Sequence, residues 1–183
     1  GSLFMGKEKI KDSRILKLYV TERGDAEWNN LAGADFELNK DWATLRFVYF
    51  QTDIDYYYHD SDYLEKQQMK AYGMTFNADL GKWFWLSEIG ENVFQSADHS
   101  GGEYSVLTMM GAVGYRYGAW TPLITVTRYH EHDAGAGYSP ISWNTYSLGL
   151  RYDLRSNQAF KLEWSKTDDT AGRNSGDTSV LRA

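Results

Sequence analysis

Two of the four histidines, His130 and His132, flank Glu131 near the end of a polar-apolar stretch. Imidazole and carboxylate groups at this spacing could ligate a metal ion, but two alternating histidines with no third ligand nearby are a weak zinc pattern. With Asp133 they are also the candidates for an Asp/His or Ser/His catalytic site of a hydrolase. Because no pattern indicates a positioned base and its partner, we predict neither a catalytic residue nor a metal site.

A second group of potential ligands is formed by four aspartates in a tyrosine-rich stretch: Asp53, Asp55, Asp60 and Asp62. This stretch lacks the glycine and the closing glutamate of a calcium-binding EF-hand loop. The chain has no cysteine, no Gly-x-Ser-x-Gly elbow and no phosphate-binding loop. We therefore expect no cofactor and no enzymatic activity, and we interpret these carboxylates as solvated loop charge.

The elements that position these residues are indicated by alternation of apolar and polar side chains. The clearest stretch runs from Thr145 to Lys166, two arms joined by the polar break RSNQ. Large apolar residues share one parity in each arm, while charged residues such as Arg151 and Glu163 share the other. A period of two is that of a β-strand with two unlike faces, and two such arms across a polar turn predict a β-hairpin.

The same pattern predicts ten strands in an antiparallel up-and-down meander. The predicted strands are 14–21, 31–38, 42–53, 68–79, 83–94, 104–116, 120–130, 143–154, 158–167 and a last one that starts in TSVLRA. Tight turns near residues 40, 81, 118 and 156 fall at one end, and long loops, including Ile54 to Gln67, fall at the other. One-sided loop lengths are typical of outer-membrane barrels, whereas soluble all-β domains favour Greek-key connections.

Composition fits this interpretation. The 183 residues suit one domain or part of a larger one. Aromatic residues make up 16% and there are only 2 prolines, a mixture that favours strands. The net charge of −6 argues against a nucleic-acid partner. The opening GSLFMGKEKIKDS has no signal-peptide pattern, so we expect that a signal, or a longer N-terminal part, is missing from this sequence.

Parity also predicts which residues line each face. Three tryptophans, Trp42, Trp83 and Trp120, each follow a tight turn within two residues and are predicted to form an aromatic girdle at a membrane interface. On the opposite parity the predicted pore-lining residues are Asp35, Glu37, Arg46, Arg116, Arg151, Lys161 and Glu163. Fixed charge in a wet lumen sets solute preference, whereas in a small closed barrel the same residues would fill the interior as salt bridges.

Two C-terminal motifs, YRYGAWTPLITVTRY and YSLGLRYDLRSNQAFKLEWSK, resemble the closing hairpins of Gram-negative general porins. The resemblance covers roughly residues 104–183 and implies a barrel of 16 or 18 strands, usually trimeric, through which small hydrophilic solutes diffuse passively. This chain departs from that pattern because it has about ten strands and ends in SVLRA without a terminal aromatic residue. The resemblance thus implies the C-terminal part of a larger barrel, and no constriction-loop residue can be transferred.

The predicted fold is an all-β, antiparallel, up-and-down transmembrane β-barrel, part of a larger one of 16–18 strands. The predicted function is an outer-membrane porin in a Gram-negative bacterium, in contact with outer-membrane lipid and lipopolysaccharide, passing small solutes or ions, and forming a homotrimer if the resemblance extends that far. Two alternatives stay open. One is a soluble or secreted β-barrel or sandwich that binds a glycan or protein through the tyrosine-rich stretch 54–67, and the other is an outer-membrane barrel hydrolase.

Overall fold

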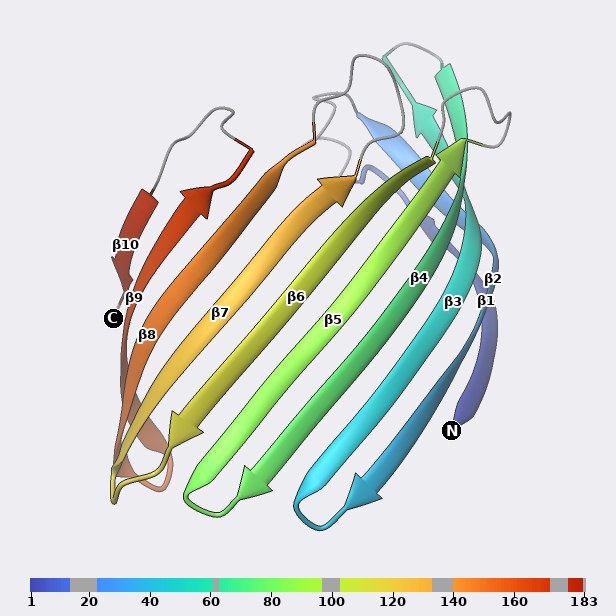
Figure 1. Ribbon diagram of the computed structural model, residues 1–183. Coiled ribbons are helices and arrows are strands. Elements are labelled where there is room, and N and C mark those ends of the chain that lie inside the picture. The colour runs from blue at the N-terminus through green and yellow to red at the C-terminus, as the bar shows by residue number, and fades with distance from the viewer. Residues whose placement is uncertain (14–22, 61–62, 97–102, 133–139, 172–177, 183) are drawn as a thin grey trace.

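Ten antiparallel strands form a single sheet in the computed structural model, which describes residues 1–13, 23–60, 63–96, 103–132, 140–171 and 178–182. Each strand pairs with the next one along the chain, so the spatial order is β1 to β10 (Figure 1). The strands are β1 (Ser2–Ile10), β2 (Gly24–Lys40), β3 (Ala43–Tyr58), β4 (Tyr63–Leu80), β5 (Trp83–Ser96), β6 (Glu103–Tyr115), β7 (Trp120–His132), β8 (Ser142–Arg155), β9 (Gln158–Asp169) and β10 (Thr178–Arg182). The predicted all-β meander is confirmed.

The N-terminal strand is not the predicted one. The predicted strand 14–21 lies outside the described residues, and β1 occupies a segment for which no strand was predicted. Leu3, Phe4 and Met5 are consecutive apolar residues, and the β1–β2 register shifts between Gly6 and Glu8. These two features hide the period of two on which the prediction depended.

The long loop predicted from Ile54 to Gln67 was also wrong, because β3 continues to Tyr58 and β4 begins at Tyr63. Likewise β2 begins at Gly24, within a predicted loop. In the added part of β3, Asp53 and Asp55 share one parity while Ile54, Tyr56 and Tyr58 share the other, and aromatic side chains favour a pleated surface. The acidic composition suggested a loop, whereas the alternation indicated a strand that extends past the other strands.

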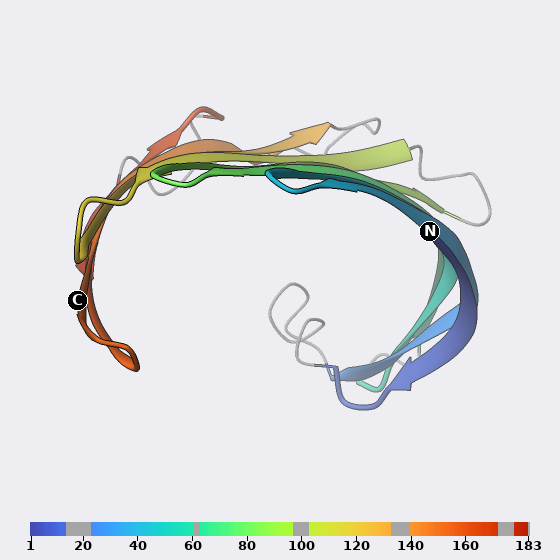
Figure 2. The ribbon, with the colours of Figure 1, turned by 90° about the horizontal axis from the view of Figure 1, so that it is seen from below.

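The tight turns were correctly predicted, and each lies at the same end of the sheet (Figure 1). Two of them use a glycine with positive φ, Gly81 at 79° and Gly118 at 59°, a conformation that side chains rarely adopt. We call the end of the sheet that carries the tight turns the turn end, and the opposite end the loop end. The β-sheet curls into an open arc whose two edge strands, β1 and β10, do not meet (Figure 2).

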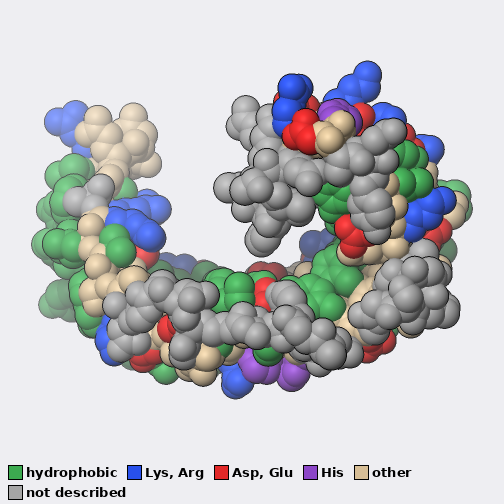
Figure 3. All heavy atoms as spheres, turned by 90° about the horizontal axis from the view of Figure 1, so that it is seen from above, with side chains coloured by type: hydrophobic (Ala, Val, Ile, Leu, Met, Phe, Trp, Pro, Cys, Tyr) green, Lys and Arg blue, Asp and Glu red, His purple; other side chains and the backbone are tan. Residues whose placement is uncertain are grey.

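Residues that face each other across an antiparallel pair project to the same side of the sheet, so the register assigns every strand residue to a face. Large hydrophobic side chains gather on the outer wall of the arm that carries the C-terminal strands, and Lys and Arg side chains gather on its inner wall (Figure 3). The apolar face is therefore convex and the charged face concave. Ile54, Met69 and Ala71, all on the concave face near the loop end, form a small buried cluster.

Candidate pore wall and its two faces

The convex face carries an apolar band across all ten strands. Many of its large side chains are at least one third exposed, for example Leu148 and Ile124, both at 53%. On β6 the band runs over eight residue steps from Tyr115 to Leu107, about 27 Å along the strand. An exposed apolar surface this large is uncommon on a soluble monomer. This face therefore needs either lipid or another apolar partner.

The loop-end boundary of the band shifts across the sheet, but unevenly: on β4 and β6 it reaches as far as on β3, to Tyr72 and Leu107, and it recedes mainly on β7 to β9. Ala43 on β3 lies in one row of cross-strand pairs with Trp164 on β9; the row continues through Ala78, Trp85, Val113, Ile124 and Leu148. On β9 the polar Lys166 follows Trp164 at the next convex position. On β3 the apolar run continues six residues past the row, to Tyr49, before a polar residue appears.

The overall shift from β3 to β9 gives an average slope. Six residues over six strands is one residue per strand, or about 3.3 Å along the strands for each 4.8 Å across them. The average boundary is then perpendicular to an axis from which the strands tilt by about 35°. Transmembrane barrel strands tilt by roughly 35–45°. At this inclination the band on β6 is about 22 Å tall, close to the roughly 25 Å apolar band of such barrels.

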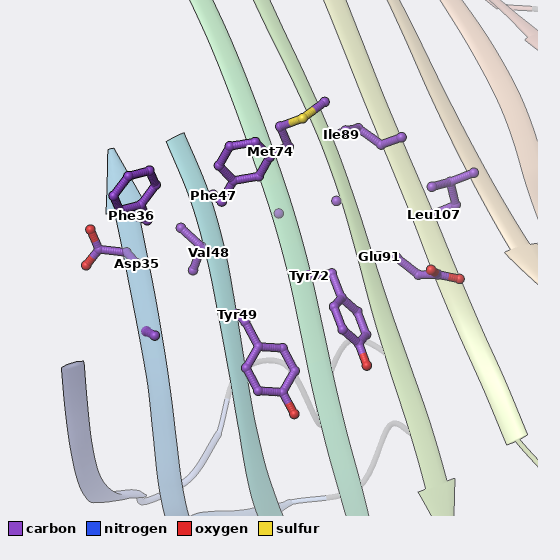
Figure 4. Close-up of a pocket in the computed structure, with 13 residues that line it drawn as sticks. Asp35, Phe36, Phe47, Val48, Tyr49, Tyr72, Met74, Ile89, Glu91 and Leu107 are labelled. Atoms are coloured by element: carbon purple, nitrogen blue, oxygen red, sulfur yellow. The ribbon is translucent and has the colours of Figure 1, made fainter. Parts of the chain in front are cut away.

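Two tyrosines mark the loop-end boundary. Tyr49 on β3 and Tyr72 on β4 are cross-strand partners with ring centroids 5.2 Å apart. Both hydroxyls point toward the loop end, while Phe47 and Met74 lie on the turn-end side (Figure 4). These residues border a shallow hollow of about 510 Å³ on the convex face. The orientation suits amphipathic rings with apolar bodies in the band and polar tips in water.

Aromatic residues also gather at the turn end of the convex face. Trp83 contacts Tyr115 with ring centroids 4.7 Å apart, and Trp120 contacts Tyr152 at 4.3 Å. The first residues of β5 and β7, Trp83 and Trp120, are two of the three tryptophans predicted to form a girdle. Trp42 lies in the tight turn before β3 and is 46% exposed. The structure places all three at the turn end.

The seven predicted pore-lining residues share the concave face: Asp35, Glu37, Arg46, Arg116, Arg151, Lys161 and Glu163. They lie in its turn-end half. The predicted set did not include three of their partners, Asp79, Asp153 and Arg182, although Asp153 shares the parity of Arg151. Ion pairs join Arg116 to Asp79 at 2.8 Å, Arg151 to Asp153 at 2.7 Å, Arg46 to Asp35 at 3.9 Å and Arg182 to Glu163 at 3.7 Å.

Arg116 is the most firmly held of these cations. Its two terminal nitrogens donate to both Asp79 carboxylate oxygens, at 2.8 and 2.9 Å, and Nη1 also donates to the Gly81 carbonyl at 2.5 Å. The guanidinium also lies 4.7 Å from the centre of the Phe84 ring. This bidentate geometry fixes one positive and one negative charge beside the turn-end opening.

The loop-end half of the concave face is aromatic, which was not predicted. We call these residues the inner aromatic belt: Trp28, Phe50, Tyr56, Phe94, Tyr104, Tyr129 and Trp143. Tyr129 and Trp143 stack in parallel with ring centroids 4.1 Å apart. Tyr56 lies nearer to the loop end than the convex band reaches. Burial raises the pKa of its hydroxyl, and the Glu65 carboxylate raises it further. Two of its members, Trp28 and Tyr56, lie in segments predicted as loops.

The histidine candidates lie on the convex face at the loop end. His130 and His132 contact each other edge to face at 4.3 Å, and His130 Nδ1 lies 3.0 Å from Ser142 Oγ. Ser142 is 8% exposed and accepts a hydrogen bond from Thr170 Oγ1 at 2.7 Å, which leaves little access for a substrate. Within the described ranges no three ligating side chains gather around a common point. Asp133 and Asp62 lie outside those ranges.

Among the described residues there is no helix with the length and apolarity needed to cross a membrane. No protein-family model, curated protein or solved structure matches this chain. The resemblance to general porins therefore stays a prediction from the C-terminal motifs, and the proposal that follows depends on the geometry of the two faces.

Proposed function

We propose that this chain forms the wall of a water-filled channel in the outer membrane of a Gram-negative bacterium, through which small hydrophilic solutes or ions diffuse. The observation that carries the proposal is the slanted polar boundary of the convex band, whose average slope corresponds to strands tilted by about 35°. That tilt fits strands that cross a membrane, whereas a soluble sheet has no reason to slant its polar boundary in this way.

The two aromatic zones of the convex face support this proposal. Trp83 and Trp120 lie at the turn end, and Tyr49 and Tyr72 lie at the loop end. Tryptophan and tyrosine concentrate where hydrocarbon meets lipid headgroups. The apolar band thus has an amphipathic border on each side, as expected of a lipid-facing surface.

The concave face supplies the aqueous side of the wall. Its charges are accessible, for example Arg46 with 47% of its side chain exposed and Arg151 with 49%. Charges that pair in an open arc, and not in a filled core, can stay hydrated. The structure thus favours the reading in which these residues line water over the one in which they fill a small closed barrel.

Closure of the channel requires more strands. The edges of the sheet, β1 and β10, lie apart (Figure 2), and β10 carries only exposed side chains. Unpaired strand edges cannot face hydrocarbon, because their backbone donors and acceptors would lack partners. We propose that the ten strands belong to a larger barrel of 16–18 strands.

Because these ten strands do not close by themselves, the proposal is tested on the protein that includes the remaining strands of the proposed barrel. That protein is folded in detergent, heat-modifiable migration is measured on a gel, and single channels are recorded in planar bilayers. We expect β-structure that depends on detergent and discrete conductance steps. A chain that folds as a monomer without detergent would exclude the channel and favour a soluble binding module.

A further inference from the structure

We propose that the inner aromatic belt is a binding site for organic cations, solutes that carry an ammonium group on an apolar body. The inference deepens the proposed function and rests on it, since it assumes that the concave face lines an accessible aqueous lumen. It names the class of solute that this wall retains on its passage.

The belt offers a hollow of suitable size. A concave-face pocket of about 260 Å³ is lined by Tyr129, Trp143, Thr108, Thr127, Met110 and Glu88. Arg128 also borders it, but alternates with Thr127 and Tyr129, so its guanidinium points to the convex face. The pocket therefore combines aromatic rings, hydroxyl groups, a thioether and one carboxylate.

Hydrogen bonds to Glu131 position the aromatic pair of Tyr129 and Trp143. The Tyr129 hydroxyl donates to Glu131 Oε1 at 2.5 Å, and the Tyr104 hydroxyl donates to the same oxygen at 2.9 Å. The Ile141 amide donates to the second Glu131 oxygen at 2.8 Å, and Glu131 is only 4% exposed. A carboxylate with three donors fixes the Tyr129 ring, and with it the stacked Trp143. The platform is thus organised before a ligand arrives.

The fixed charge near the belt is negative. Within the described strands the cations on the concave face all lie in its turn-end half: Arg46, Arg116, Arg151, Lys161 and Arg182. The carboxylates Glu65, Glu88 and Glu131 lie at or beside the belt. Glu88 is exposed and has no ion-pair partner among the described residues. Aromatic faces beside an unpaired carboxylate attract cations through the ring quadrupole and direct charge.

The test is calorimetric titration of the detergent-folded chain with choline and with its uncharged isostere, in which carbon replaces the quaternary nitrogen. We expect choline to bind about tenfold more tightly than the isostere. Glu88→Gln should weaken choline binding several-fold and leave the isostere unchanged. Trp143→Ala should weaken choline binding, and Trp143→Phe, which keeps a ring against Tyr129, should restore most of it. Trp164→Ala on the convex face is the control and should have no effect.

Equal affinity for choline and its isostere would overturn the inference, as would absence of choline binding or full binding by Trp143→Ala. The proposed function fails separately. A chain that conducts without binding choline retains the channel and loses the cation site, and a chain that binds choline without conducting retains the site and loses the channel.

Discussion

Phe84 on β5 covers Gly114, its cross-strand partner on β6: a Cβ added at position 114 would lie 2.1 Å from the Phe84 Cζ atom. On the same two strands, a Cβ at Gly111 would meet nothing within 4 Å. The two glycines thus differ in a way that their sequence context does not reveal. One accommodates a ring that also contacts the Arg116 guanidinium, and the other leaves a gap in the convex band.

This difference predicts opposite effects of one substitution. Gly114→Val should destabilise the folded chain by about 1–3 kcal/mol, because the Phe84 ring must leave its position over the strand. Gly111→Val should be neutral or stabilising, since valine favours strands and fills open space on the apolar face. Urea unfolding of each variant in lipid vesicles measures both. Equal losses at the two positions would contradict the packing described.

A charge on the convex face should be far more costly than the same charge one residue away. Leu148→Arg lies in the middle of the apolar band and is expected to cost roughly 2–4 kcal/mol of folding free energy in a bilayer. Ser147→Arg, on the concave face, should cost less than about 1 kcal/mol because its side chain reaches water. The free energies of unfolding in vesicles provide the comparison, and a Ser147→Arg penalty as large as that of Leu148→Arg would exclude the assigned faces.

The Arg116–Asp79 pair should influence conduction more than stability. Both side chains are largely exposed, at 44% and 58%, and exposed ion pairs contribute about 0–1 kcal/mol. Arg116→Gln leaves the Asp79 carboxylate unpaired at the turn-end opening, and should shift the reversal potential in a salt gradient toward greater cation preference. Lys82→Gln, in the adjacent turn, serves as the control. An unchanged reversal potential in Arg116→Gln would mean that ions do not pass this pair.

The turn-end tryptophans should lie at a lipid interface. In variants that keep one of the 7 tryptophans and replace the others by phenylalanine, Trp120 fluorescence should be quenched by lipids brominated near the headgroup. Trp28, on the concave face, should be quenched much less by the same lipids. Similar quenching of both residues would contradict the girdle.

The sequence predicted the parts of the fold that depend on strict alternation. Strands β3 to β9, their tight turns and the faces of residues such as Leu148 and Arg151 follow from a period of two. β7 keeps a continuous register with both neighbours, which places Ile124 and Val126 on the convex face without a bulge.

Other features could not be read from alternation. The inner aromatic belt joins seven residues from six strands, β2, β3 and β5 to β8, whose proximity depends on cross-strand register and not on spacing along the chain. Trp143 follows a stretch without clear periodicity, and its contact with Tyr129 arises only from the β7–β8 pairing. Asp79, the partner of Arg116, was missed for the same reason, since the two residues are 37 positions apart in the sequence.

The most direct test of the account is a nitroxide scan of β8 in lipid vesicles, which is simple because the chain has no cysteine. Single cysteines replace residues 145–152 in turn and carry a spin label, whose collisions with oxygen and with a water-soluble nickel complex are compared. We predict that labels at Tyr146, Leu148 and Leu150 favour oxygen, which partitions into lipid, while labels at Ser147, Gly149 and Arg151 favour nickel. Loss of this alternation, or its reversal, would contradict a lipid-facing convex wall.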